Sequence, residues 1–171
     1  MASTTPSTTH SQLDVDPEGD LMLLVGSQNQ QSIRVSSKML SLASAVFATL
    51  LSPRFAEGRA LADIGSSTIL IVPLPEDDPA AMVWICKALH FCYSSTVGGP
   101  AVAVLMATAT LYDKYDLSKA LCSWSHVWLE QWRTSCWINV STPELLCISY
   151  ALGYRDTFCD MSTMMIKNYT K

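Results

Sequence analysis

The stretch SIRVSSKMLSLASAVFATLL, residues 32–51, decides the fold class because the spacing of its apolar residues changes partway along it. Residues 32–36 alternate polar and apolar side chains, which predicts a β-strand with one buried face. From Lys38 to Leu51 there are few helix breakers, so we expect one or two short helices that end before Pro53. A strand that runs directly into short helices indicates a fold that combines both kinds of element.

Two further strands are expected on either side of this stretch. Leu21 to Val25 is an apolar run ending at Gly26, and the polar residues 27–31 predict a hairpin that joins it to the strand at 32–36. Residues 68–74 form an apolar, β-branched run closed by prolines, which predicts a third strand. Residues 56–67, between the short helices and this strand, are predicted to form a loop.

The remainder of the chain has the spacing of consecutive helices. Asp78-Pro79 predicts a helix start, because the Asp side chain can accept a backbone N–H and Pro suits the first helical position. Gly98-Gly99-Pro100 separates this helix from the next, and Ser141-Thr142-Pro143-Glu144 opens a later one with a capping box. The last helix is expected from about Asp156 to Asn168. Strands first and helices afterwards predict an α+β fold, in which a small β-sheet is covered by a helical bundle.

Composition and charge narrow the classes of function. The chain has 171 residues, of which 15% are charged, and its net charge is −4. The 11 Lys and Arg form no basic run, so the chain lacks the cationic footprint of a protein that binds DNA or RNA directly. The longest mostly apolar stretch, residues 101–111, is too short to cross a bilayer, and residues 1–11 have no apolar core of a secretory signal. We therefore expect an intracellular chain, cytoplasmic or nuclear, without a membrane segment and with six reduced cysteines.

Six short motifs follow one another along the chain in a characteristic order. They are Gly19-Asp20-Leu21, Ile33-x-Val35-x-x-x-x-Leu40-x-x-x-Ser44-x-x-Phe47, Phe55-Ala56-Glu57-Gly58, Leu74-Pro75-Glu76-Asp77-Asp78-Pro79, Tyr93 and Leu111-Tyr112-Asp113-Lys114-Tyr115-Asp116-Leu117. Together they resemble the BTB/POZ family, especially the short forms common in fungi. The resemblance covers residues 18–122, so we expect a BTB/POZ-like domain there and a C-terminal helical extension at 123–171. The Ser- and Thr-rich residues 1–17 are expected to form a disordered tail.

The resemblance implies a function without catalysis. BTB/POZ domains mediate protein–protein interactions, so we expect a module that forms homodimers or heterodimers and needs no cofactor. In dimers of the family, the first strand and the first helix meet their symmetry mates. Carried over to this chain, the expected partner-binding residues are Leu21 and Leu23 on the strand and Met39, Leu42 and Ala43 around the first helix.

The sequence departs from the family pattern in three places. Ser36 stands where many members have His, and Ala43 stands where zinc-finger relatives have an Arg. In those relatives that Arg lines a charged co-repressor pocket with the counterpart of Asp20. Cullin adaptors of the family carry a hydrophobic-x-Glu element after the long helix, and the comparable Val97-Gly98-Gly99 lacks the acid. A ubiquitin-ligase substrate adaptor that binds a cullin remains an alternative function.

An enzyme is the third alternative. The chain has no Gly-x-Ser-x-Gly, His-Glu-x-x-His, Walker or Gly-x-Gly-x-x-Gly motif. Two Cys-x-x-x-His pairs, Cys86 with His90 and Cys122 with His126, each share a helix face and leave a zinc- or thiol-dependent enzyme open. The favoured interpretation is that the thiols pack as small apolar groups beside partly exposed imidazoles. We therefore expect no catalytic residue and no metal ligand.

A tryptophan repeat marks the expected extension. Trp124, Trp128 and Trp132 recur every four residues and therefore share one helix face. They form either a ridge that binds a partner or, as we favour, a stripe that packs the extension onto the domain. The methionines of the last helix allow the same two interpretations.

Overall fold

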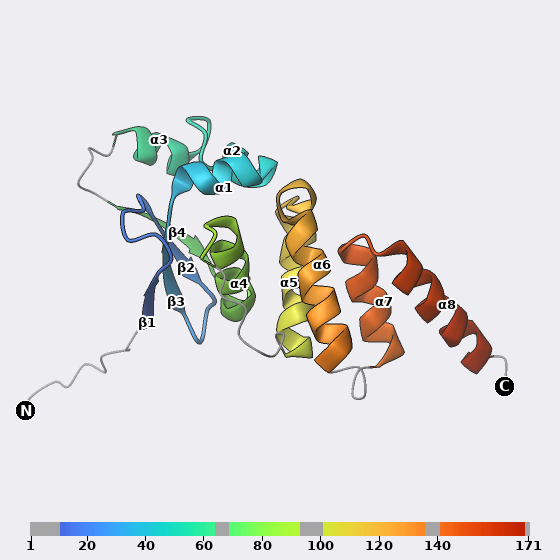
Figure 1. Ribbon diagram of the computed structural model, residues 1–171. Helices are drawn as coiled ribbons and strands as arrows, with labels where there is room; N and C mark the ends of the chain where they lie inside the picture. The colour runs from blue at the N-terminus through green and yellow to red at the C-terminus, as the bar shows by residue number, and fades with distance from the viewer. Residues whose placement is uncertain (1–10, 64–68, 93–100, 136–140, 170–171) are drawn as a thin grey trace, which may run out of the picture.

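The protein is an α+β fold, with a small sheet at one end and helices beside it (Figure 1). The computed structural model describes residues 11–63, 69–92, 101–135 and 141–169. The elements in chain order are β1 (Ser11–Asp14), β2 (Leu21–Val25), β3 (Gln31–Val35), α1 (Ser37–Ala43), α2 (Ala45–Leu50), α3 (Ala56–Asp63), β4 (Leu70–Leu74), α4 (Pro79–Leu89), α5 (Val102–Lys114), α6 (Ser118–Ser135), α7 (Thr142–Ala151) and α8 (Arg155–Tyr169). The predicted fold class is confirmed.

The four-stranded sheet has the order β1-β3-β2-β4. β2 and β3 form the predicted antiparallel hairpin, while β1 pairs with β3 and β4 pairs with β2 in parallel. α4 lies along one face of the sheet, and the α1–α2 hairpin lies across its upper end (Figure 1). The sheet thus contributes one side of the core and the helices contribute the other.

The prediction of a disordered tail over residues 1–17 is wrong for its last part. Ser11–Asp14 forms β1, whose residues pair with Gln31 to Arg34 of β3. Leu13 packs against the core and Val15 is buried in it. Only Leu13 within this edge strand and Val15 just after it face the core, so the strand carries almost no apolar pattern. Residues 1–10 lie outside the described residues.

The prediction of a loop at residues 56–67 is also wrong, because Ala56–Asp63 forms α3. Gly58 is a poor helix former when judged by propensity alone. In the fold, however, a Cβ at Gly58 would lie 1.9 Å from the carbonyl oxygen of Ser52. Glycine is therefore required here because α3 packs directly against the backbone that follows α2, a long-range contact that local sequence does not reveal.

The predicted helix starts are confirmed by their capping bonds. Asp78 accepts a hydrogen bond from the Ala81 N–H at 2.8 Å, and Pro79 occupies the first helical position of α4. Ser141 and Glu144 form the expected capping box at the start of α7. These side chains satisfy N–H groups that the helix itself leaves unpaired.

The end of α4 carries a strained residue. Cys92 N donates to Lys87 O at 2.9 Å and Phe91 N donates to Ala88 O at 3.2 Å, which is the bonding pattern of a Schellman turn. Phe91 occupies the left-handed position of this turn with φ +57°. That position favours glycine, and the Phe91 ring is largely exposed.

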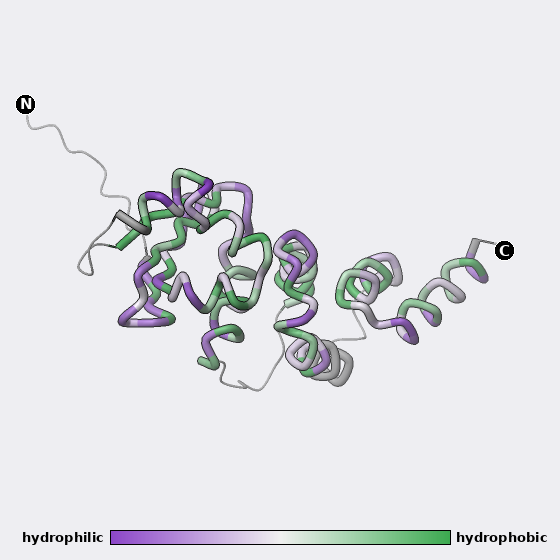
Figure 2. The backbone as a smooth tube through the Cα atoms, turned by 90° about the horizontal axis from the view of Figure 1, so that it is seen from above, coloured by the Kyte–Doolittle hydropathy of each residue, from purple (hydrophilic) through white to green (hydrophobic). Residues whose placement is uncertain are grey.

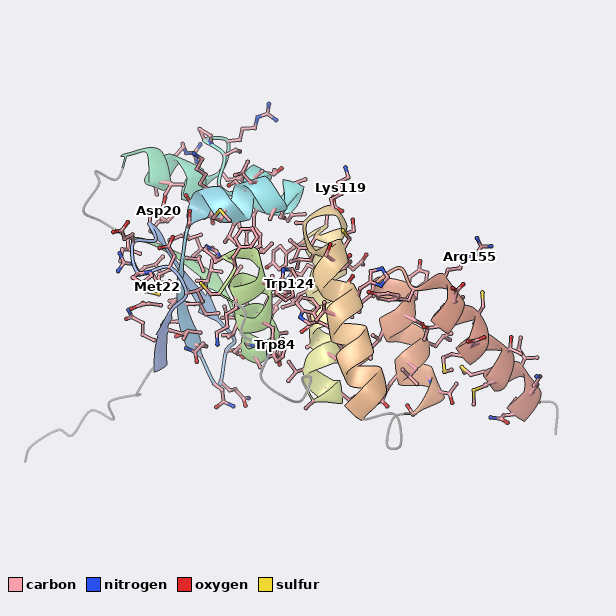
Figure 3. All side chains as sticks on the ribbon, in the orientation of Figure 1. Asp20, Met22, Trp84, Lys119, Trp124 and Arg155 are labelled. Atoms are coloured by element: carbon pink, nitrogen blue, oxygen red, sulfur yellow. The ribbon has the colours of Figure 1, made fainter. Side chains whose placement is uncertain are left out.

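One hydrophobic core extends from Val15 beside the sheet to Met161 in α8. Trp128 is fully buried in this core and meets Trp84 of α4 edge to face, with ring centroids 6.5 Å apart. Figure 3 shows Trp84 and Trp124 between α4 and the α5–α6 pair. Packing, not partner binding, is therefore the role of Trp128, while the side chain of Trp132 lies outside the described residues.

The helices after α5 continue the same fold away from the sheet. α6 runs without interruption through residues 122 and 123, where the boundary between domain and extension was expected. α7 and α8 lie at the end of the molecule opposite the sheet (Figure 2). Among the described residues, no helix has an apolar run of the length that a bilayer crossing requires.

Candidate protein-interaction surface

One side of the α1–α2 hairpin is anchored to the end of α5. Ser44 separates the two helices with an extended backbone, and its hydroxyl accepts the Phe47 N–H at 3.0 Å to cap α2. The same hydroxyl donates to the Tyr115 carbonyl oxygen at 2.6 Å. The Phe47 ring stacks on the Tyr115 ring with centroids 4.3 Å apart. Ser44 and Phe47 of the hairpin therefore both contact Tyr115, at the C-terminal end of α5.

Asp77 ties the loop before α4 to the same place. Its carboxylate is 1% exposed, accepts a hydrogen bond from the Tyr115 hydroxyl and lies 2.5 Å from Lys114 Nζ. Burial raises the pKa of Tyr115, and the hydrogen bond to Asp77 raises it further, so the phenol stays neutral. Residues 33–47 therefore contact the Asp113-Lys114-Tyr115 segment through Ser44 and Phe47. Asp77 joins the loop before α4 to the same segment.

The opposite side of the hairpin is apolar and open to solvent. Leu42 of α1 is 76% exposed, Val46 of α2 is 39% exposed and Phe55 after α2 is 46% exposed. Around α2 the surface is hollowed into a shallow groove of about 460 Å³. Its lining residues are Ala45, Val46, Thr49, Leu50 and Phe55. We define the α1–α2 surface as Met39, Leu42 and Ala43 together with these five groove residues.

Three of the five predicted partner-binding residues lie on α1 and are at least partly exposed. Leu42 is exposed, and Met39 and Ala43 are half-buried. Leu21 and Leu23, in contrast, are 0% exposed and form part of the internal core. Their side chains are not available to a partner in this fold.

The sequence could not orient β2 because both of its faces are apolar. Leu21, Leu23 and Val25 point into the core, while Met22 and Leu24 are half-buried. Figure 3 shows Met22 on the side of the sheet turned away from α4. Successive side chains of a strand alternate between faces, so a shift of one position exchanges the two sets.

Sequence reasoning missed Val46, Leu50 and Phe55. A usable signal existed, since Val46 follows Leu42 by four residues and Leu50 follows Val46 by four. Within α2 that spacing places Val46 and Leu50 on one side of the helix, whereas the extended backbone of Ser44 breaks the helical phase between Leu42 and Val46. Phe55 lies beyond Pro53 and is brought to the groove only by the turn between α2 and α3.

Cations flank the groove. Arg54 precedes Phe55, and Arg59 lies one helical turn after it, with its N–H donating to the Phe55 carbonyl oxygen at 3.1 Å. Both arginines are exposed, and neither side chain has a partner among the described residues. Lys38, one turn before Leu42, is exposed as well, and the half-buried Glu57 is the single acid between residues 38 and 59.

Asp20 has a structural role at the start of α1. Its two carboxylate oxygens accept the Ser37 N–H at 2.7 Å and the Ser37 hydroxyl at 2.6 Å. The carboxylate of Asp20 thus has Ser37 as its partner. The other positions compared with the family, Tyr93 and Val97-Gly98-Gly99, lie outside the described residues.

The first Cys-x-x-x-His pair is used internally. His90 Nε2 accepts the Ser36 N–H at 3.0 Å, and Nδ1 lies 2.9 Å from the Cys86 carbonyl oxygen. These two bonds fit the neutral ring with its proton on Nδ1. Burial raises the pKa of the Cys86 thiol to about 12, which opposes formation of a nucleophilic thiolate.

The second pair, Cys122 and His126, lines a cleft of about 580 Å³ between α5, α6 and the turn before α8. The His126 ring meets Tyr154 edge-on with centroids 4.8 Å apart, and the Tyr154 hydroxyl donates to Ser125 Oγ at 3.2 Å. Arg155, at the rim, points outward (Figure 3). Within the described part of the chain, no three His, Cys, Asp or Glu side chains gather closely enough to hold a metal ion.

Comparison with known proteins adds no relative: the chain matches no family model and no curated protein.

Proposed function

We propose that the chain is a non-catalytic protein-interaction module of the BTB/POZ type, which associates with a second copy or with another protein through the α1–α2 surface. The observation that carries the proposal is the two-sided hairpin. Ser44 and Phe47 fix one side to Tyr115, while Leu42 and Val46 expose large apolar side chains on the other. A group of exposed apolar side chains on a rigid support is typical of a protein interface.

The contact between the hairpin and the Asp-Lys-Tyr segment supports the BTB/POZ part of the proposal. Two of the six motifs that carry the resemblance, residues 33–47 and 111–117, lie about 60 residues apart in the sequence, and the resemblance requires them to share one fold. The bonds from Ser44 to Tyr115 and from Tyr115 to Asp77 join both stretches to the loop before α4.

The proposal also includes a location inside the cell, in the cytoplasm or nucleus. The five cysteines of the described residues, Cys86, Cys92, Cys122, Cys147 and Cys159, form no disulfide among themselves. Free thiols are typical of reducing compartments. Protein partners are favoured over nucleic acid because the Lys and Arg residues do not cluster into a phosphate-binding run.

Sedimentation velocity over a wide range of protein concentrations tests self-association through this surface. We expect the wild type to form dimers, and Leu42→Glu and the double variant Met39→Glu/Leu42→Glu to remain folded monomers. Leu42 is exposed, so its substitution leaves the core intact. The matched control is Met164→Glu, which places the same charge at an exposed apolar residue of α8. A monomeric wild type, or dimers that persist in the Leu42 variant, would refute self-association through the α1–α2 surface.

A further inference from the structure

The groove on α2 offers a partner apolar contacts and almost no hydrogen bonding. Of its lining residues, only Thr49 has a polar side chain, and the Thr49 hydroxyl already donates to the Ala45 carbonyl oxygen at 2.8 Å. The groove therefore suits apolar side chains of a partner and has no polar group that a small polar ligand would need for orientation.

The chain segment that contains the groove residues differs in charge from the rest of the protein. Residues 38–59 contain three cations, Lys38, Arg54 and Arg59, and one acid, Glu57. The whole chain has 11 Lys and Arg and 15 Asp and Glu, so the remaining residues carry 8 cations and 14 acids. A segment with charge +2 thus stands on a chain whose other residues sum to −6.

Arg54 and Arg59 are exposed, and both lie close in the chain to Phe55, which lines the groove. Arg54 adjoins Phe55 in sequence, and Arg59 follows it by one turn of α3. Neither guanidinium is held by an acid among the described residues, so both remain available for carboxylates. An isologous contact centred on this groove would place arginines near arginines, which is unfavourable, so a second copy would use the α1 part of the surface, Met39, Leu42 and Ala43, and leave the groove to another protein.

We infer that the groove binds an acidic, amphipathic helical segment of another protein. Apolar side chains of the segment fill the groove between α2 and Phe55, and its carboxylates pair with Arg54 and Arg59. The inference rests on the proposed function, because it uses part of the α1–α2 surface, and it goes further by naming the chemistry of the partner. Such helix-in-groove recognition reads apolar residues at helical spacing and uses charge for orientation and specificity.

Selection from a phage-displayed library of random 16-residue peptides tests the inference. On the wild type we expect enrichment of peptides that combine Asp or Glu with apolar residues three or four apart. Val46→Asp, which places a charge in the groove at an exposed position, should abolish this enrichment. Arg54→Glu/Arg59→Glu should weaken the enriched acidic peptides by about tenfold or more, since two attractive pairs become repulsive.

A matched control separates the local charge from the net charge. Arg155→Glu/Lys167→Glu changes the net charge by the same amount at exposed residues of α8, and it should leave peptide binding unchanged. Enrichment of basic or neutral peptides, equal weakening in this control, or no enrichment relative to Val46→Asp would overturn the inference. Self-association that depends on Leu42, measured separately by sedimentation, would then stand without it, so failure of the inference is distinguishable from failure of the proposed function.

Discussion

Ser44→Ala is the most direct test of how the hairpin is fixed to the helical part of the fold. The Ser44 side chain is buried and makes two bonds, accepting from Phe47 N and donating to the Tyr115 carbonyl oxygen. Alanine removes both bonds while keeping the Cβ. We expect a lower free energy of unfolding and a hairpin that separates more easily from α5.

The expected size follows from the two bonds. Loss of an N-cap serine costs about 1 kcal/mol. The Tyr115 carbonyl oxygen, left without its donor, adds about 1–2 kcal/mol because unsatisfied buried polar groups are costly. The sum is about 2–3 kcal/mol, or a fall of about 5–10 °C in the melting temperature for a chain of this length.

Urea unfolding followed by tryptophan fluorescence measures this change, since Trp84 and Trp128 lie in the core region near α4. Ser36→Ala is the matched control, because the Ser36 hydroxyl also caps a helix by accepting the Met39 N–H, at 3.4 Å. Unlike the Ser44 hydroxyl, it makes no second bond to a distant carbonyl oxygen among the described residues. The control should cost at most about 1 kcal/mol. A loss for Ser44→Ala no larger than that of the control would refute the reasoning.

Three other changes have expected outcomes. The free energy of unfolding should fall as pH rises above about 9. In the unfolded chain the Cys86 thiol ionises at its ordinary pKa of 9.0, whereas in the folded chain burial raises its pKa to about 12. Between these two values the ionisation of this one thiol should lower the free energy of unfolding by about 1.4 kcal/mol per pH unit. Urea titrations at pH 8 to 11 check this, and an alkaline decline as steep in Cys86→Ala as in the wild type would contradict it. Gly58→Ala should destabilise by about 1–3 kcal/mol through the close approach to Ser52, whereas a gain in thermal stability would show that the contact is absent. Phe91→Gly should stabilise by about 1 kcal/mol in denaturant titrations by relieving the left-handed backbone, and a loss of stability would mean that packing of the Phe91 ring outweighs the backbone strain.

The parts of the fold that the sequence predicted are those set by local chemistry. The change from alternating to helical spacing at residues 32–51 located β3, α1 and α2, because side-chain period distinguishes strand from helix. Asp78 and Ser141 located two helix starts, since a capping side chain acts within its own first turn.

The parts that the sequence did not predict depend on contacts between distant residues. β1 forms because it pairs with the edge of β3. Gly58 is placed within α3 because the backbone of Ser52 packs directly against that position. The inward orientation of Leu21 and Leu23 follows from where α4 packs and not from the run Leu21–Val25, which is apolar throughout. The groove was missed for the same reason, since Phe55 reaches α2 only through the turn at Pro53.

The edge position of β1 matters to anyone who shortens this chain for crystallisation. Trimming the Ser- and Thr-rich beginning to residue 18 would remove one of the two strands that pair with β3 and leave the Arg34 carbonyl without the N–H groups of Val15 and Asp16. An exposed strand edge readily pairs with an edge from another molecule, so the shortened protein would precipitate or form dimers through β3, distinct from the association proposed for the α1–α2 surface.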